Sequence, residues 1–236
     1  MPHSALKHKE IADTQLKYFV VPANDLVVLP SFSRKIKRAM DIVIAVVALV
    51  ILCPVFVLIA LMLKIEGQGG SVFYGGARVG KYARPFNCWK FRSMQPDADH
   101  LLDDYLNANP MLKRHWEKFC KLPNDPRVTT HTARIIRKLS LDELPQLWNV
   151  LVGDMSLVGP RPMLVEEMQY CGSRIAYYLS VRPGLTGLWQ VSGRNNTSFK
   201  HRVHLDSWYV RNWSLWQDVL IMLKTPFAVL NTKGAY

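Results

Sequence analysis

The stretch IVIAVVALVILCPVFVLIALML, residues 42–63, determines how this chain must be placed, because none of its 22 side chains is charged or strongly polar. An α-helix rises 1.5 Å per residue, so these residues would form about 33 Å of helix, and the hydrocarbon core of a bilayer is about 30 Å thick. A secretory signal is not expected, because the run begins late, is too long and is not followed by a small-residue cleavage site. A helix buried in a soluble core would usually keep a polar face. The stretch therefore predicts contact with a membrane.

A proline near the middle of this stretch bears on whether the helix crosses the membrane. Pro54, which follows Cys53, has no backbone donor and clashes with the carbonyl of Val50, so it should kink or break the helix. Basic residues flank both ends of the run, and by the positive-inside tendency both ends favour the cytoplasm. On these grounds a re-entrant helix that enters and returns and an ordinary kinked spanning helix are equally open.

The composition indicates a folded, basic protein. The chain has 236 residues, of which 49% are hydrophobic and 20% are charged, which excludes a disordered chain. Its formal net charge of +12 favours polyanionic partners: nucleic acid, an anionic membrane surface or phosphorylated substrates. No known nucleic-acid motif accompanies the apolar run, so nucleic acid is not expected as a partner. The four cysteines lie more than 30 residues apart, which argues against a disulfide framework and for a reducing compartment.

Hydrophobic patterns and turn residues predict an α/β fold that is mainly helical with a small sheet. Four aromatic residues, Trp208, Tyr209, Trp213 and Trp216, lie just before the apolar stretch 219–223 and predict an interfacial amphipathic segment, although a Trp-rich core helix is the alternative. The expected strands cover residues 72–74, 86–91 and 185–191. The expected helices cover residues 97–106, 111–121, 140–151, 163–180 with an interruption near Gly172, 198 onward, and 214–230.

The pair Asp142-Glu143 is the first candidate for chemistry. Ser140 and Glu143 have capping-box spacing, and acidic residues in the first turn of a helix suit its dipole, so a purely structural role is one interpretation. The functional alternative uses the same geometry. A carboxylate held ionised at a helix start, near Arg137, can attack a phosphorus atom or hold a divalent cation.

Several arginines stand in rigid turns and predict a site for a diphosphate. Two prolines flank Arg161, which lowers the entropy lost when the side chain grips a phosphate, although a simple helix-entry turn is the alternative. Glycines 75, 76 and 80 with Lys81 fit G-x-x-x-x-G-K, but Tyr82 stands where a P-loop needs Ser or Thr, so a turn that presents Arg78 is preferred. The arginines assigned to the diphosphate are Arg78, Arg92, Arg137, Arg161, Arg182 and Arg194.

Taken together, several motifs resemble those of one family. In order, they are a basic start, the proline-containing apolar helix, KFRSM (90–94), LSLDELPQL (139–147), GDMSLVGPRP (153–162), RPGLTG (182–187) and SGRN (192–195). The chain from about residue 34 to its end is similar to the bacterial sugar transferases, the monotopic polyprenyl-phosphate phosphoglycosyl transferases. Its C-terminal sequence resembles long members that transfer galactose-1-phosphate, so this chain is either a naturally short member or a catalytic fragment.

The resemblance implies a reaction and a set of roles. A UDP-sugar and undecaprenyl phosphate would give undecaprenyl-diphospho-sugar and UMP, with Mg²⁺ as cofactor, as the first membrane step of surface polysaccharide synthesis. Asp142 would attack the β-phosphorus and lie close to the metal, and Glu143 would assist as acid, base or orienting group. The implied phosphate-binding residues are Arg78, Lys90, Arg92, Arg137, Arg161, Arg182 and Arg194.

The resemblance also implies an organisation in the bacterial inner membrane. It favours a membrane-monotopic fold with a polar arm over residues 1–33, a re-entrant helix over 34–66 and a catalytic domain over 67–236 on the cytoplasmic face, with interfacial helices beside the membrane. Family members often have Ser where Cys53 precedes the proline; because a thiol is a weaker hydrogen-bond partner, the break should be less sharp. The chain could form a homodimer. UDP-galactose is the preferred donor and UDP-glucose the alternative, and a non-catalytic basic membrane adaptor is a second class of function.

Overall fold

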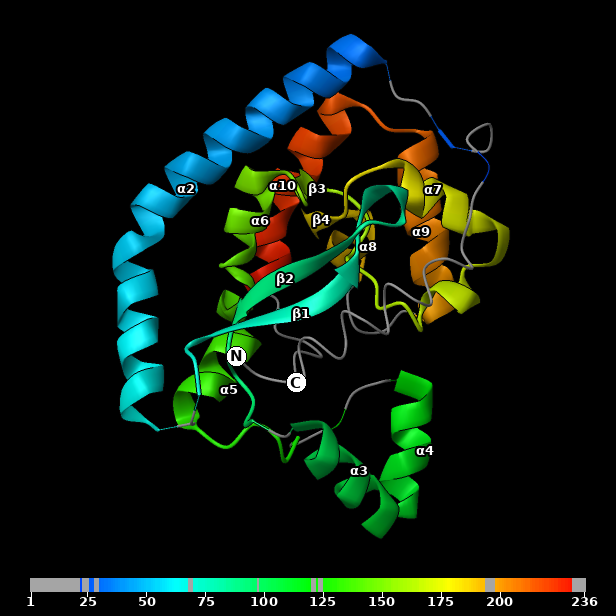
Figure 1. The fold of residues 1–236 in the computed structure, drawn as a ribbon. Coiled ribbons are helices and arrows are strands. Elements are labelled where there is room, and N and C mark those ends of the chain that lie inside the picture. Colours follow the sequence, from blue (N-terminus) through cyan, green and yellow to red (C-terminus); the bar gives the residue numbers. More distant parts are fainter. Residues whose placement is uncertain are drawn as a thin grey trace.

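The computed structural model describes residues 22, 26–27, 30–67, 70–96, 98–119, 122, 125–193 and 198–230. Within that part, helix α2 (Ser31–Ile65) lies along one side of a globular body made of short helices and strands (Figure 1). The mainly helical fold with little sheet is as predicted. Most of the predicted arm over residues 1–33 falls outside the described residues, as does Arg194.

Helix α2 is bent but not broken. It continues through Pro54 as one helix, and Figure 1 shows it changing direction partway along its length. Of the two predicted outcomes, a kink or a break, the structure shows the kink: a proline removes one backbone hydrogen bond, and a bend relieves its clash while the bonds on either side persist. By length and composition α2 could cross a membrane. Its described side chains are mostly exposed, including Val43, Val50 and Ile51 at 61%, 70% and 68%.

The first sheet is a hairpin. Strand β1 (Phe73–Val79) pairs antiparallel with β2 (Pro85–Phe91), with Phe73 opposite Phe91, and the 3₁₀ turn η2 (Lys81–Ala83) joins them. Both strands were predicted, although β1 is longer than expected. The G-x-x-x-x-G-K stretch thus forms strand and turn, and no helix follows it to cradle a phosphate.

A second sheet joins two distant loops. Strand β3 (Ser156–Val158) pairs parallel with β4 (Gly184–Thr186), with Ser156 opposite Gly184. The expected strand over residues 185–191 is correct only at its start, because helix α8 (Leu188–Val191) follows β4 directly. The described part of the chain therefore has two two-stranded sheets where one small sheet was predicted.

Short helices complete the structure. Helices α3 and α4 form an arm that projects from the body (Figure 1) and pack on each other through Leu102, Leu106 and Trp116. The predicted helix over 140–151 is divided into η3 and α6, and the predicted helix over 163–180 is mainly 3₁₀ turns followed by α7. The bounds are α3 (Ala98–Ala108), α4 (Pro110–Phe119), α5 (His131–Lys138), η3 (Leu141–Glu143), α6 (Gln146–Val152), η4 (Met168–Tyr170), η5 (Gly172–Arg174), α7 (Ile175–Ser180), α9 (Phe199–Arg211) and α10 (Leu215–Leu230).

The predicted capping box at Ser140 does not form. Ser140 has φ 54°, in the left-handed region, and its side chain makes no capping hydrogen bond. An N-cap residue needs an extended backbone, whereas this residue reverses the chain between α5 and η3. Helix α6 begins only at Gln146, so the acidic pair lies on a 3₁₀ turn before it.

The inner face of α2 packs on the body along its length. Ala45 belongs to a core cluster with Val150 of α6 and Leu157 of β3. Beyond the bend, Ile59 and Leu63 form a second cluster with Phe91 and Ile136. Leu141 and Leu144, on either side of the acidic pair, pack against this second cluster. The acidic pair is therefore fixed next to the C-terminal half of the apolar helix.

Tyr178 provides a test of the packing between β1 and the segment after Pro162. Its buried hydroxyl donates to the carbonyl of Val79 and accepts the amide of Met163 at 2.9 Å. Tyr178→Phe would leave both backbone groups unpaired, so we expect the free energy of unfolding to fall by about 1–3 kcal/mol in urea titrations of the detergent-solubilised protein. Tyr170→Phe removes a hydroxyl from a side chain that is 68% exposed and should change the free energy of unfolding by less than about 0.5 kcal/mol. Equal effects of the two substitutions would contradict this account.

Candidate active site

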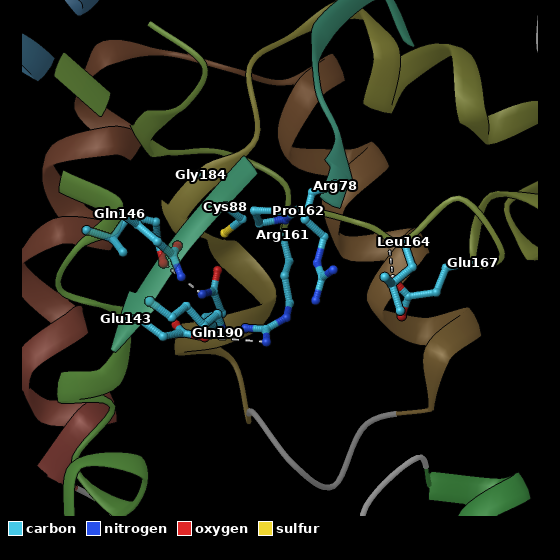
Figure 2. Close-up of a pocket in the computed structure, with 12 residues that line it drawn as sticks. Arg78, Cys88, Glu143, Gln146, Arg161, Pro162, Leu164, Glu167, Gly184 and Gln190 are labelled. Atoms are coloured by element: carbon cyan, nitrogen blue, oxygen red, sulfur yellow. Dashed lines mark hydrogen bonds and ion pairs between the residues drawn. The ribbon is translucent and has the colours of Figure 1, made fainter. Parts of the chain in front are cut away.

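A pocket, here called the Glu143 pocket, lies where β1, β2, η3 and the loop around Arg161 meet (Figure 2). Figure 2 shows the side chains of Arg78 and Arg161 extending into it. Three of its charged lining residues are cations and two are acids. The lining residues are Arg78, Cys88, Lys90, Glu143, Gln146, Arg161, Pro162, Leu164, Glu167, Gly184, Leu185 and Gln190.

Glu143 is the centre of the ion pairs in this pocket. Its Oε1 lies 2.7 Å from Lys90 Nζ and 3.5 Å from Arg161 Nη2. The carboxylate raises the pKa of Arg161, so this guanidinium stays charged. The structure thus brings together three residues that the sequence assigned to one site: Glu143, Lys90 and Arg161.

Asp142 precedes Glu143 on η3 and is 8% exposed. It is not among the residues that line the pocket. Burial raises the pKa of its carboxyl, and the charges of Lys90, Arg137 and Arg161 oppose that rise. The predicted ionisation by an α-helix start does not apply, because α6 begins four residues later. The nearby cations are what favour the charged form here.

Asn149 fixes the turn that carries the acidic pair against β2. Its Oδ1 accepts the amide of Trp89 at 2.9 Å, and its Nδ2 donates to the carbonyl of Asn87 at 2.8 Å and to Asp154 at 3.1 Å. Asn149 is 1% exposed, so these bonds are shielded from water. Trp89 precedes Lys90 in β2. The hydrogen bonds of Asn149 therefore hold the strand that carries Lys90 against α6, and Lys90 lies opposite Glu143.

Two glycines allow the loop that carries Arg161 to approach its neighbour. A Cβ at Gly184 would lie 2.1 Å from the backbone nitrogen of Gly159, and a Cβ at Gly159 would lie 2.6 Å from the carbonyl oxygen of Arg182. The backbones instead bond directly: the amide of Gly184 donates to Pro160 at 2.7 Å, and that of Gly159 donates to Thr186 at 2.9 Å. Gly184, the glycine of the motif RPG (182–184), therefore holds the loop of Arg161 in place.

The remaining predicted phosphate ligands are dispersed. Arg78 lines the Glu143 pocket, and its Nη1 donates to its neighbour Ala77 at 2.7 Å. Arg92 does not line the pocket, and its Nε donates to the carbonyl of Ser71 at 2.7 Å. Arg137 lies at the end of α5 and acts on Asp142 only through its charge. Arg182 donates to the carbonyl of Gly153 at 2.7 Å and lines a different cavity.

Sequence reasoning missed three polar residues of the pocket. Gln146 is 3% exposed, and Gln190 has a buried Oε1 without a hydrogen-bond partner among the described residues. Glu167 accepts the amide of Leu164 at 2.8 Å and faces Arg202 at 3.3 Å. Gln146 could have been found, because Gln146 and Asn149 are polar residues three apart in an otherwise apolar helix.

Comparisons with known proteins identify the family of this chain. The family model described as bacterial sugar transferase matches residues 32–232. The chain is 50% identical over 205 residues to the undecaprenyl-phosphate galactose phosphotransferase of Salmonella typhimurium, covering 86% of this chain and 42% of that protein. It is 48% identical over 204 residues to the UDP-galactose-lipid carrier transferase of Erwinia amylovora, covering 86% of this chain and 42% of that protein.

A shorter relative is similar over most of its length. The exopolysaccharide production protein ExoY of Rhizobium meliloti is 48% identical over 200 residues, which cover 85% of this chain and 88% of that protein. The chain spans about two fifths of the length of the Salmonella and Erwinia relatives. The extent of the family match and these identities establish that the chain belongs to the bacterial sugar transferase family.

Proposed function

We propose that this chain transfers a sugar 1-phosphate from a UDP-sugar to undecaprenyl phosphate, releasing UMP, in the synthesis of a surface polysaccharide. UDP-galactose is the preferred donor, because the Salmonella and Erwinia relatives are named for galactose. UDP-glucose is the alternative. The observation that carries the proposal is the Asp142-Glu143 pair beside a pocket with three cations, next to the apolar helix α2.

The charges of the Glu143 pocket suit a diphosphate donor. Phosphoryl transfer depends mainly on positioning and on neutralising charge, and guanidinium groups bind phosphate oxygens in a bidentate fashion. Arg78 and Arg161 supply two such groups, and Lys90 supplies a third cation. Gln146 and Gln190 add amide groups that could hydrogen-bond a sugar or a base.

In the proposed reaction Asp142 is the nucleophile. One of its oxygens forms a bond to the β-phosphorus of the donor while the bond from that phosphorus to the bridging oxygen of UMP breaks. An oxygen of the lipid phosphate then attacks the same phosphorus and releases Asp142. Lys90 and Arg161 hold Glu143 and neutralise charge beside the reacting phosphate.

The acidic pair fits a Mg²⁺ ion shared with substrate. The described residues contain no group of three or more His, Cys, Asp or Glu side chains that could hold a metal. Mg²⁺, however, is usually bound through one or two carboxylates together with substrate phosphates and water. Asp142 would hold the ion, since Glu143 already pairs with Lys90 and Arg161. When bound, the ion would neutralise charge on the diphosphate.

The contacts at both ends of α2 support a re-entrant placement, which we propose to be at the cytoplasmic face of the inner membrane. Near its start, Lys37 pairs with Asp218 of α10 at 2.6 Å. At its end, Glu66 accepts the hydroxyl of Thr132 at 2.8 Å. Both partners belong to one globular body, whereas the ends of a spanning helix would lie on opposite sides of the bilayer. The exposed apolar face of α2 would then lie in the cytoplasmic leaflet, and the exposed Trp216 and Phe227 of α10 suit the interface.

Asp142→Asn should abolish catalysis without unfolding the protein. We expect UMP release from a panel of UDP-sugars, with detergent-solubilised protein, Mg²⁺ and undecaprenyl phosphate, to fall at least about 10³-fold, because the amide is not a nucleophile. Asp104→Asn is the control, since Asp104 is exposed on α3. Undiminished, lipid-dependent UMP release by the Asp142 variant would refute the assigned role.

The pH dependence tests the environment of Asp142. The carboxyl must be ionised to attack, and burial raises its pKa, so kcat/KM should fall as the pH falls through that raised pKa. The charge of Lys90 lowers this pKa, so Lys90→Gln should move the acid limb to higher pH as well as slow the reaction. Lys138→Gln removes an exposed cation and should leave the limb in place. An unmoved limb in the Lys90 variant would argue that another group titrates.

The placement of α2 can be tested by labelling its two ends. Lys35→Cys and Ile65→Cys, each in a background whose four native cysteines are replaced with alanine, put a thiol at exposed positions on either side of the apolar run. A membrane-impermeant maleimide added to spheroplasts should label neither position until the inner membrane is lysed. Labelling of one position in intact spheroplasts would instead indicate a spanning helix.

A further inference from the structure

A second cavity lies apart from the Glu143 pocket, and the two share no lining residue. We call it the Arg182 cavity. The first turns of α2, the turn η2, strand β3, the segment after α7 and the region from the end of α9 to Trp213 enclose it. Its lining residues are Arg34, Lys37, Arg38, Asp41, Lys81, Ser156, Val158, Val181, Arg182, Tyr209 and Trp213.

The lining of this cavity is strongly cationic. It contains five basic side chains and a single carboxylate, that of Asp41. Asp41 is already engaged, because it accepts the amide of Leu157 at 3.0 Å. Positive charge in the cavity therefore exceeds the negative charge that faces it, and repulsion among these groups would be relieved by an anion.

Three of the cations have structural partners. Lys37 pairs with Asp218, which also accepts the hydroxyl of Tyr209 at 2.6 Å. Arg38 donates to the carbonyls of Val150 and Leu151 at 2.6 and 2.7 Å, and so caps the end of α6. Arg182 uses its Nε on the carbonyl of Gly153. These contacts explain the placement of the three groups but supply no second carboxylate to the cavity.

The other two cations have no such partner. Among the residues that the structure describes, the side chains of Arg34 and Lys81 form neither a hydrogen bond nor an ion pair; Lys81 only lies over the ring of Tyr82, at 4.6 Å from its centroid. The hydroxyl of Ser156, 1% exposed, also lines the cavity, next to the Asp41 carboxylate, whose pKa burial raises and this hydroxyl lowers. A hydroxyl can rotate, so it can donate either to Asp41 or to an anionic oxygen bound in the cavity.

The position of the cavity indicates where such an anion would come from. Arg34, Lys37 and Arg38 immediately precede the apolar run of α2. Exposed apolar side chains lie beside them: Phe32 is 74% exposed and Ile36 is 40% exposed. Trp216, on the helix whose Asp218 holds Lys37, is 67% exposed. Aromatic and basic residues at the start of a membrane-embedded segment lie at the level of the lipid headgroups.

We propose that the Arg182 cavity binds the phosphate of an anionic glycerophospholipid, such as phosphatidylglycerol, and that it is a lipid site separate from the site of sugar transfer. Arg34 and Lys81 would bind the phosphate oxygens, with Ser156 as a hydrogen-bond donor. The proposal rests on the membrane placement of α2 given above and does not depend on the reaction. The bound lipid would fix the start of α2, and with it α10, at the membrane surface.

The test measures lipid binding by the full chain in detergent. Native mass spectrometry would follow titration with phosphatidylglycerol, with phosphatidylcholine as the neutral lipid. We expect preference for phosphatidylglycerol, and about tenfold weaker binding by the double variant Arg34→Gln/Lys81→Gln, which removes two charge-assisted contacts and no hydrogen bond or ion pair within the described protein. Lys113→Gln/Arg114→Gln, on exposed positions of α4, loses the same charge and should bind like the wild type.

A further substitution and competition experiments test whether the bound phosphate belongs to a glycerophospholipid. Arg34→Lys keeps the charge but loses the fork of donors, so binding by a defined site should weaken, whereas diffuse electrostatic attraction should not. Inorganic phosphate should compete poorly, and undecaprenyl phosphate should bind here no more tightly than phosphatidylglycerol. Equal lipid binding by the Arg34/Lys81 variant and its control, or full competition by inorganic phosphate, would overturn the proposal. UMP release in detergent by the Arg34/Lys81 variant should match the wild type, so failure of lipid binding and failure of the proposed reaction are distinguishable.

Discussion

Helix α2 is attached to the same globular body by polar contacts near both of its ends, and the rest of the structure depends on this constraint. Lys37 and Asp41, near the start of the helix, and Glu66, just beyond its end, make these contacts with the body. Between these points its inner face packs on two core clusters and its outer apolar face is exposed. An exposed apolar face of this length is a surface that lipid or another apolar partner would cover. In the placement proposed above, the membrane meets the molecule along α2, and this would set where every other element lies relative to lipid.

That constraint explains why the acidic pair belongs beside the second half of α2. A reaction between a water-soluble nucleotide sugar and a lipid phosphate needs a site open to water and next to lipid. Leu141 and Leu144 pack toward α2, while Glu143 between them faces Lys90 and Arg161 in the polar pocket. One short turn thus has an apolar side and a charged side. The backbone contact between Gly159 and Gly184 completes the arrangement by holding the loop of Arg161 opposite this turn.

The sequence predicted those features that follow from composition and local pattern. The apolar helix with a kink at Pro54, the two strands of the first sheet and the grouping of Glu143, Lys90 and Arg161 were all predicted, the last through the family resemblance. Two features depend on long-range contacts and were not predicted. Ser140 reverses the chain instead of capping a helix, and Arg182 faces a second cavity while Gly184, two residues later, supports the active-site loop. Spacing along the chain identifies a rigid turn but does not reveal which of its residues faces the site.

The burial of Asp142 has two opposing consequences for the proposed chemistry. Loss of solvent raises the pKa of the carboxyl and so disfavours the charged nucleophile. The same loss of solvent strengthens the attraction of Lys90, Arg137 and Arg161 for the carboxylate and limits the access of water to a phosphorylated aspartate. Water is the competitor of the lipid phosphate in the second half of the reaction. A fully exposed aspartate would be ionised more readily, but the acyl phosphate that it forms in the proposed reaction would also hydrolyse more readily. In that reaction, burial among fixed cations would therefore favour transfer to lipid over hydrolysis.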